Sequence, residues 1–120
     1  MLRVILVDDE PYIAQGLTKL VNWQEEGFEI MEVFANGKEA LAYLREHTVE
    51  LIIADIKMPE MDGLEATKII KKEMPDMPII ALTANAFESD REQALAAGCD
   101  DFLSKPVNAD VCLATIAKYI

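Results

Sequence analysis

Three runs of bare hydrophobic residues constrain the fold of this chain most, because each has the length of a β-strand and carries no polar residue. They cover residues 4–7, 51–54 and 79–82. A strand that is apolar on both faces is buried on both faces, which is typical of parallel sheets covered by helices on either side. These runs therefore predict an α/β fold.

Two weaker strand candidates complete the set. Residues 30–34 are interrupted by Glu32, which suits an edge strand, and Phe102 and Leu103 form a short fifth candidate. Shortly before them, Gly98 suits the left-handed backbone conformation that is common just after the end of a helix.

Helix-start signals lie between the strand candidates. In three places a capping side chain precedes a Glu by three residues, so that each can bond to a backbone amide of the other. The remaining two starts are a proline that suits the first helical position and a plain asparagine cap. In chain order the five starts are Pro11, Asn36, Asp62, Ser89 and Asn108. We expect helices over residues 37–46 and 90–97, and a last helix from about Ala109.

The first and last of these helices each carry one hydrophobic face. The first face consists of Ile13, Leu17, Leu20 and Val21, and the last of Leu113, Ile116, Ala117 and Ile120. Spacings of three and four residues place each set on one side of a helix, so we expect both faces to pack on the sheet.

The alternation of strands and helices predicts five βα units in one domain, residues 1–120. Connections between parallel strands are right-handed and need a helix, so helices cover both faces of the sheet. Such a doubly wound sheet binds ligands at the carboxyl ends of its strands, where the strand order reverses. The polar residues that end strands at this edge are Asp8, Asp9, Asp55, Thr83 and Lys105.

The formal net charge of −11 argues against several classes of partner. Nucleic-acid surfaces need clustered Lys and Arg, whereas acidic residues outnumber basic ones by 22 to 11, so we expect no direct nucleic-acid binding. No segment is long enough to cross a bilayer, and we expect a cytoplasmic chain without membrane contact. Cys99 and Cys112 are too few and too far apart for a metal site, so buried, reduced thiols are expected.

Three carboxylates at one edge of the sheet would repel one another unless a cation lay between them. Mg²⁺ suits this role because it prefers oxygen ligands, keeps several waters and binds phosphate oxygens. With Asp8 and Asp9 supporting the ion, Asp55 could attack a phosphorus atom as a nucleophile. Lys105 would pair with one phosphoryl oxygen and the Thr83 hydroxyl would hydrogen-bond another. The product is an aspartyl phosphate.

Each of these residues also has a purely structural explanation. Asp9 or Glu10 could be a helix cap, Asp55 a turn residue, Thr83 the end of a strand, and Lys105 a solvated charge. Their conjunction at one sheet edge is what favours a site.

Four segments carry a resemblance that covers the whole chain. VDDEP ends the first strand, IIADIKMPEMDG surrounds Asp55, ALTA contains Thr83 and FLSKP contains Lys105. Each is weak alone, but together and in this order they resemble the receiver domain of two-component response regulators, the chemotaxis receivers among them.

The resemblance implies a flavodoxin-like sheet with strand order 2-1-3-4-5 and five helices. In the family the second acid of the pair and the phosphoacceptor bind Mg²⁺ directly, which corresponds to Asp9 and Asp55, with Asp8 assisting. The backbone carbonyl of Lys57 completes the protein ligands, although a solvated side chain explains Lys57 equally well. The bond between Lys105 and Pro106 is expected to be cis.

The resemblance also implies how the domain signals. A histidine kinase or a histidine phosphotransfer domain donates the phosphoryl group, Thr83 moves inward, and Phe102 turns into the vacated space. Phe102 replaces the commoner Tyr, which keeps the ring and removes the hydroxyl. The fourth helix, fifth strand and last helix form the output surface and the candidate surface for a homodimer. Such a receiver catalyses its own phosphorylation and dephosphorylation but is not a classical enzyme.

The two halves of the chain are similar to different receivers. Residues 7–30 are similar to receivers joined to transcription factors of the arabinose-regulator type, and residues 81–107 to receivers of hybrid histidine kinases. The output of the domain therefore stays open.

Two other function classes compete with the phosphoacceptor switch. A degenerate receiver would bind partners without phosphorylation, but the acid pair, Asp55 and Lys105 are all present. A phosphatase of the haloacid dehalogenase type would need an acid at the position of Lys57 and a cap domain for its substrate, and the sequence offers neither.

Overall fold

The computed structural model describes residues 2–55, 63–83, 92, 95–104 and 107–119. The elements in chain order are β1 (Leu2–Val7), α1 (Pro11–Leu20), β2 (Phe28–Phe34), α2 (Gly37–Glu46), β3 (Leu51–Asp55), α3 (Gly63–Glu73), β4 (Ile79–Thr83), β5 (Asp101–Ser104) and α5 (Ala109–Ala117). Glu92 and residues 95–97 are also helical and belong to the helix expected over 90–97, whose other residues lie outside the described part.

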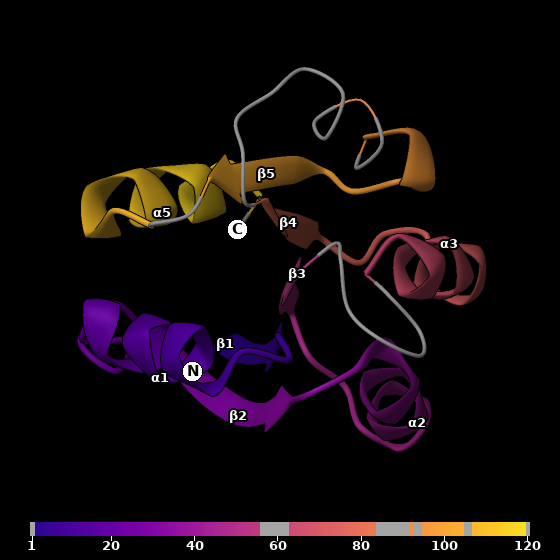
Figure 1. Ribbon diagram of the computed structural model, residues 1–120, viewed down its shortest axis with the longest axis horizontal. Helices are drawn as coiled ribbons and strands as arrows, with labels where there is room; N and C mark the ends of the chain where they lie inside the picture. The colour runs from indigo at the N-terminus through magenta and orange to yellow at the C-terminus, as the bar shows by residue number, and fades with distance from the viewer. Residues whose placement is uncertain (1, 56–62, 84–91, 93–94, 105–106, 120) are drawn as a thin grey trace.

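The strands form one parallel sheet with the order β2-β1-β3-β4-β5. The strand order that the resemblance to receivers implies is thus confirmed, and β2, which Glu32 marks as an edge strand, lies at the edge. Figure 1 shows α1 and α5 on one face of the sheet and α2 and α3 on the other. The fold is the flavodoxin-like α/β architecture, with the order reversing between β1 and β3.

The bare hydrophobic runs are explained by this layering. Along β1, Val4 and Leu6 pack into the cluster under α1 and α5, whereas Ile5 and Val7 pack into the cluster under α2 and α3. Successive residues of a strand point to opposite faces, so a strand covered on both sides needs an apolar residue at every position.

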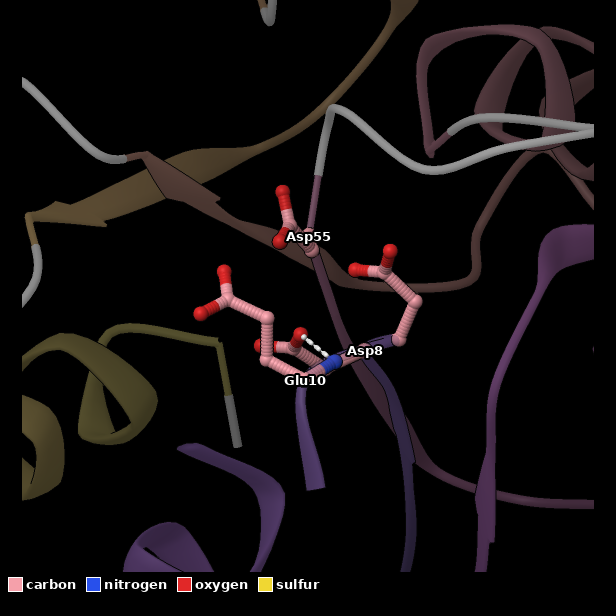
Figure 2. A group of neighbouring side chains, drawn as sticks. Asp8, Glu10 and Asp55 are labelled. Atoms are coloured by element: carbon pink, nitrogen blue, oxygen red, sulfur yellow. Dashed lines mark hydrogen bonds between the residues drawn. The ribbon is translucent and has the colours of Figure 1, made fainter. Parts of the chain in front are cut away.

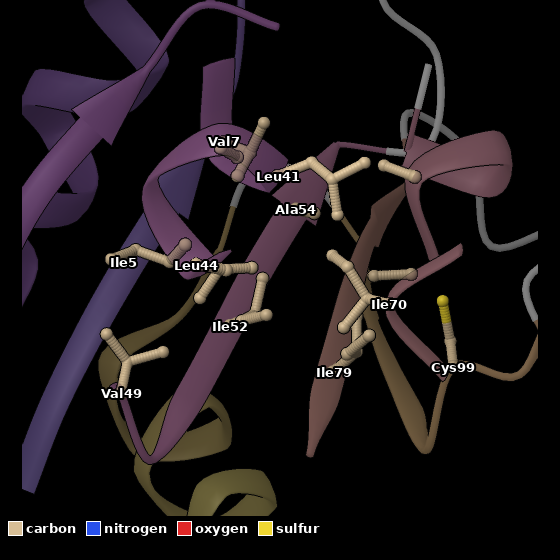
Figure 3. Close-up of a cluster of buried hydrophobic side chains, with 13 residues drawn as sticks. Ile5, Val7, Leu41, Leu44, Val49, Ile52, Ala54, Ile70, Ile79 and Cys99 are labelled. Atoms are coloured by element: carbon tan, nitrogen blue, oxygen red, sulfur yellow. The ribbon is translucent and has the colours of Figure 1, made fainter. Parts of the chain in front are cut away.

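Figure 3 shows the second of these clusters, in which side chains of the central strands meet two helices. The strands supply Ile5, Val7, Ile52, Ala54 and Ile79, and the helices supply Leu41, Leu44 and Ile70. Full burial of one such aliphatic side chain stabilises the fold by about 1.5–3 kcal/mol. This packing holds the carboxyl ends of β1 and β3 in fixed positions.

Two helix starts agree with the sequence in atomic detail. The Asn36 side chain accepts a hydrogen bond from the Glu39 amide at 2.9 Å, and the Asn108 side chain accepts from the amides of Asp110 and Val111. Pro11 is the first residue of α1, as predicted. The other two predicted caps, Asp62 and Ser89, lie outside the described residues.

The expected hydrophobic face of the last helix is wrong at one position. Ala117 is exposed, whereas Cys112, Thr115 and Ile116 are buried and Leu113 is half-buried. The buried face of α5 is therefore shifted by one residue toward the N-terminus from the predicted face. It includes Cys112 and Thr115, which the hydrophobic spacing did not single out. On α1, Leu17 is buried as expected, and Val21 is buried just beyond the helix end.

Both cysteines are free and buried, as predicted. Burial raises the pKa of the Cys112 thiol to about 11, so it stays protonated at neutral pH. In the described part of the chain no helix is both long enough and apolar enough to cross a membrane.

Replacement of glycine by alanine should have opposite effects on the free energy of unfolding at two positions. Gly98 has a φ of +108°, as the expected helix end requires, and an added Cβ would lie 3.0 Å from Lys71 Cγ, whereas Gly16 in α1 has nothing within 4 Å. Gly98→Ala should lower the free energy of unfolding by about 1–2 kcal/mol. Gly16→Ala should raise it by about 0.5–1 kcal/mol, because alanine favours a helix interior. Urea unfolding measures both, and effects of the same sign would contradict this account of Gly98.

Candidate functional site

Asp8 is the first residue beyond β1 and turns the chain toward α1. Its amide donates to Phe34 O at 2.9 Å, which extends the ladder between β1 and β2 by one residue. Its Oδ1 accepts a hydrogen bond from the Glu10 amide at 2.9 Å, as Figure 2 shows. This side-chain turn lets Pro11 begin a helix with only three residues between it and the strand, and it holds the Asp8 carboxylate at the sheet edge.

Asp55 occupies the matching position on the next strand. It is the last residue of β3 and pairs with Leu82 of β4. Because Val7 pairs with Ala54, Asp8 and Asp55 follow the same pair of the ladder and emerge side by side. Both side chains are buried, with 3% of Asp8 and 5% of Asp55 exposed.

The acidic residues converge as the sequence predicted, with one addition. Oxygen atoms of Asp8, Asp9, Glu10 and Asp55 all lie within 4.8 Å of one another. Figure 2 shows the carboxylates of Asp8, Glu10 and Asp55 gathered at the ends of β1 and β3. Asp9 and Glu10 face solvent more than the other two. We call these four residues the acidic group.

Glu10 is the residue that the sequence-based prediction missed. Its place before Pro11 indicates only a possible helix cap, yet at the start of α1 it makes no side-chain capping hydrogen bond to the described backbone. Its place as the third acid of VDDEP was the available signal. Its carboxylate lies in the acidic group instead.

The acidic group offers only carboxylate oxygens as ligands. In the residues that the structure describes, no histidine or cysteine joins it. Hard cations such as Mg²⁺ and Ca²⁺ prefer oxygen ligands, whereas zinc sites are usually built with His or Cys. Like charges this close repel one another, so a divalent cation would relieve the repulsion.

Thr83 ends β4 next to Asp55 and Leu82. Its side chain is buried, with 1% exposed, and its hydroxyl donates to Leu103 O over 3.5 Å. A hydrogen bond of that length is weak, because such bonds between oxygens are usually 2.5–3.0 Å long. The hydroxyl can therefore change partner at small cost.

Phe102 lies on the same face of the sheet as Thr83. Phe102 pairs with Ala81 and Thr83 pairs with Ser104, so the two side chains are diagonal neighbours on adjacent strands. Phe102 is half-buried and packs against the cluster under α2 and α3. Thr83 and Phe102 are therefore placed as neighbours on this face of the sheet.

Three predicted residues lie outside the described part of the chain. Lys105 and Pro106 follow the end of β5 at Ser104, and Lys57 follows Asp55 by two residues. Their predicted roles, and the cis bond between Lys105 and Pro106, stay predictions.

Comparison with known proteins gives one consistent family. A family model described as the response regulator receiver domain matches residues 4–117. The polar-differentiation response regulator DivK of Brucella anthropi is 36% identical over 119 residues, which are 98% of this chain and 94% of that protein. The heme response regulator HssR of Staphylococcus saprophyticus is 40% identical over 106 residues, which are 88% of this chain and 46% of that protein.

A solved structure agrees with these sequence matches. The chemotaxis response regulator CheY4 of Vibrio cholerae superposes with a TM-score of 0.87 and 31% identity, covering 100% of this chain and 99% of that one. The chain spans less than half of HssR and nearly all of DivK. Each of these matches extends over both halves of the chain, so none of them separates one half from the other. The predicted likeness of each half to a different kind of receiver stays a prediction.

Repulsion within the acidic group predicts that removing one charge stabilises the metal-free protein. With a chelator present, Asp9→Asn should raise the free energy of unfolding by about 0.5–1 kcal/mol, the size of other exposed charge interactions. This gain in stability should shrink in 1 M salt, where the Debye length is only about 3 Å and the repulsion is screened. Asp76→Asn, which removes an exposed charge outside the group, is the matched control and should change little. Loss of stability in Asp9→Asn would mean that these acids do not repel one another.

Proposed function

The chain belongs to the response regulator receiver domain family, and from this premise we propose that Asp55 accepts a phosphoryl group at a Mg²⁺ site formed by the acidic group. Receivers of this family generally bind Mg²⁺ at an acidic cluster and interact with histidine kinases or phosphotransfer proteins. The observation that carries the proposal is the convergence of Asp8, Asp9 and Glu10 with Asp55 within 4.8 Å.

We assign the metal ligands by residue. Asp9 and Asp55 would bind the ion directly, Asp8 would assist, and the Lys57 carbonyl would complete the protein ligands. Asp8 is suited to a supporting role because one of its oxygens already accepts the Glu10 amide. When bound, Mg²⁺ draws charge from the phosphoryl oxygens and aligns the donor with the acceptor.

The reaction moves one phosphoryl group from a donor histidine to Asp55. An Asp55 carboxylate oxygen forms a new P–O bond as the P–N bond of the phosphohistidine breaks. The freed imidazole keeps the electron pair of the broken bond. Lys105 would pair with a phosphoryl oxygen as a point charge. Burial of Asp55 supports this step, because hydrogen bonds and ion pairs to the phosphoryl group are stronger where water is excluded.

The conformational response starts at Thr83. Its weak hydrogen bond to Leu103 O would be exchanged for a stronger one to a phosphoryl oxygen. Phe102, a diagonal neighbour on the same face, would then turn into the vacated space. The fourth helix, β5 and α5 would form the output surface and a possible homodimer contact. Because Phe102 has no hydroxyl, the coupling to Thr83 is steric.

The two competing functions are less well supported. A phosphatase of the haloacid dehalogenase type would need an acid where Lys57 stands, and the family model that matches residues 4–117 is that of a receiver. A receiver that works without phosphorylation would not need to bring Asp55 into the acidic group. The activities of full-length relatives such as HssR do not transfer to this chain.

Acetyl phosphate with Mg²⁺ should add one phosphoryl group to the protein. The bond should be base-labile, since acyl phosphates hydrolyse readily, and intact mass spectrometry measures the gain. Asp55→Asn should remain unlabelled, whereas Asp110→Asn, which neutralises an exposed acid of α5, should label like the wild type. Equal labelling of the Asp55 variant would contradict the proposal.

Thr83→Ala should separate the phosphorylation of Asp55 from the conformational response at Phe102. The variant should still accept phosphate, because the acidic group is intact, yet lose at least half of the shift that beryllium fluoride causes in the Phe102 amide resonance. Thr83→Ser keeps the hydroxyl and should restore that shift. Nuclear magnetic resonance measures both, and an undiminished Phe102 shift in Thr83→Ala would exclude the hydroxyl as the link.

A further inference from the structure

Glu10 lies on the exposed side of the acidic group. Its carboxylate is one of those whose oxygens lie within 4.8 Å of one another, and Figure 2 shows it near the carboxylates of Asp8 and Asp55. Asp8 and Asp55 are buried, whereas Asp9 and Glu10 are exposed. The group therefore has a buried side, which includes the proposed phosphoacceptor, and an exposed side that faces an approaching phosphodonor.

The backbone of Glu10 is held by the residues around it. Its amide donates to Asp8 Oδ1 at 2.9 Å, and Pro11 follows it as the first residue of α1. A residue before proline is restricted to extended conformations, and Glu10 adopts one, with φ −94° and ψ 106°. Because this backbone is already ordered, the Glu10 carboxylate loses less conformational entropy on binding than a side chain on an unrestrained loop would.

The direct ligands assigned above leave part of the magnesium shell to water. They are Asp9, Asp55 and the Lys57 carbonyl, whereas Mg²⁺ has an octahedral shell of oxygens and usually keeps several waters. The ion polarises these waters, so they are good hydrogen-bond donors to a nearby carboxylate. Residues that hydrogen-bond to the ligands of a metal ion commonly change its affinity by a factor of about 10–100. Glu10 is placed for such a role because its carboxylate already lies in the group.

We infer that Glu10 holds the coordinated waters of the Mg²⁺ ion, and that it thereby strengthens metal binding before phosphorylation and opposes the phosphoryl group afterwards. The inference rests on the proposed function, because it needs an ion in the acidic group. It adds to that function a residue whose effect has opposite signs in the two states.

The charges of the acidic group explain these opposite signs. Four ionised carboxylates, each with a charge of −1, carry −4 in total, and one divalent cation neutralises half of it. Glu10 therefore favours the bound cation. When the Asp55 carboxylate becomes an acyl phosphate, its charge changes from −1 to about −2, and a phosphoryl oxygen replaces a coordinated water. Glu10 then loses a donor and lies beside a stronger anion, so its charge disfavours the phosphorylated state.

This role distinguishes Glu10 from Asp9. Asp9, as a direct ligand, supports the ion in both states, so its loss should weaken the binding of Mg²⁺ and of a phosphoryl mimic alike. Loss of the Glu10 charge should weaken the first and strengthen the second. A purely structural role of Glu10 at the start of α1 would not change the two affinities in opposite directions.

The first test measures Mg²⁺ binding to the full chain without a phosphodonor, by isothermal titration calorimetry. Glu10→Gln, which keeps the shape of the side chain and removes its charge, should bind Mg²⁺ about tenfold more weakly than the wild type. Glu10→Asp keeps the charge and should recover part of this loss. Glu39→Gln is the matched control, because Glu39 is an exposed acid in the first turn of α2 and lies outside the acidic group. Its Mg²⁺ affinity should equal that of the wild type.

The second test measures the affinity for beryllium fluoride at saturating Mg²⁺. Glu10→Gln should bind the mimic about fivefold more tightly than the wild type, the low end of typical couplings between sites. Asp9→Asn should bind it more weakly, because a direct ligand of the ion is lost. Urea unfolding with a chelator present should find Glu10→Gln at least as stable as the wild type, so that its weaker Mg²⁺ binding is not a loss of folding.

The outcomes separate the inference from the proposed function. A Glu10→Gln variant whose Mg²⁺ affinity equals that of the wild type, or whose beryllium fluoride affinity is no higher, would overturn the role of Glu10. The proposed function would stand in that case, because the wild type would still bind both. A wild-type protein that binds neither Mg²⁺ nor beryllium fluoride would overturn both.

Discussion

Repulsion among carboxylates at one edge of a buried sheet is the constraint on which the rest of this structure depends. Parallel strands end at the same edge, so residues that follow adjacent strands meet whatever their separation in the chain. Asp8 and Asp55 meet in this way and are both buried, and Asp9 and Glu10 join them. In the proposed function, a cation that relieves the repulsion would also prepare Asp55 to receive a phosphoryl group, so one arrangement would serve metal binding and chemistry.

The core supplies the rigidity that this arrangement needs. Alternate residues of β1 pack under different helices, which fixes the strand on both faces and leaves its end little freedom. Toward β5 the packing differs, because Phe102 is only half-buried and Thr83 is held by a weak hydrogen bond. The acidic group therefore lies at the rigid ends of β1 and β3. The proposed motion involves Thr83 and Phe102, whose side chains are held less tightly.

Much of this was predictable from the sequence because the signals were local. Bare apolar runs specified the strands, Asn36 and Asn108 specified helix starts, and acids after two strands specified the site. Contacts between segments that are far apart in the chain left no local pattern in the sequence, so they were not predicted. Glu10, for which a helix cap was one possible explanation, makes no side-chain capping hydrogen bond, and its carboxylate lies in the acidic group. Nothing in the spacing of residues 101–119 indicated that Asp101 would bind both Phe102 and Tyr119.

The most direct test of the central claim is a crystal structure of the protein with Mg²⁺ and beryllium fluoride. The account predicts one octahedral ion about 2.0–2.1 Å from oxygens of Asp9 and Asp55, with beryllium bonded to Asp55. The Thr83 hydroxyl should then point at a fluoride and no longer at Leu103 O. An ion bound elsewhere, or beryllium fluoride absent from Asp55 while the acidic group stays empty, would contradict it.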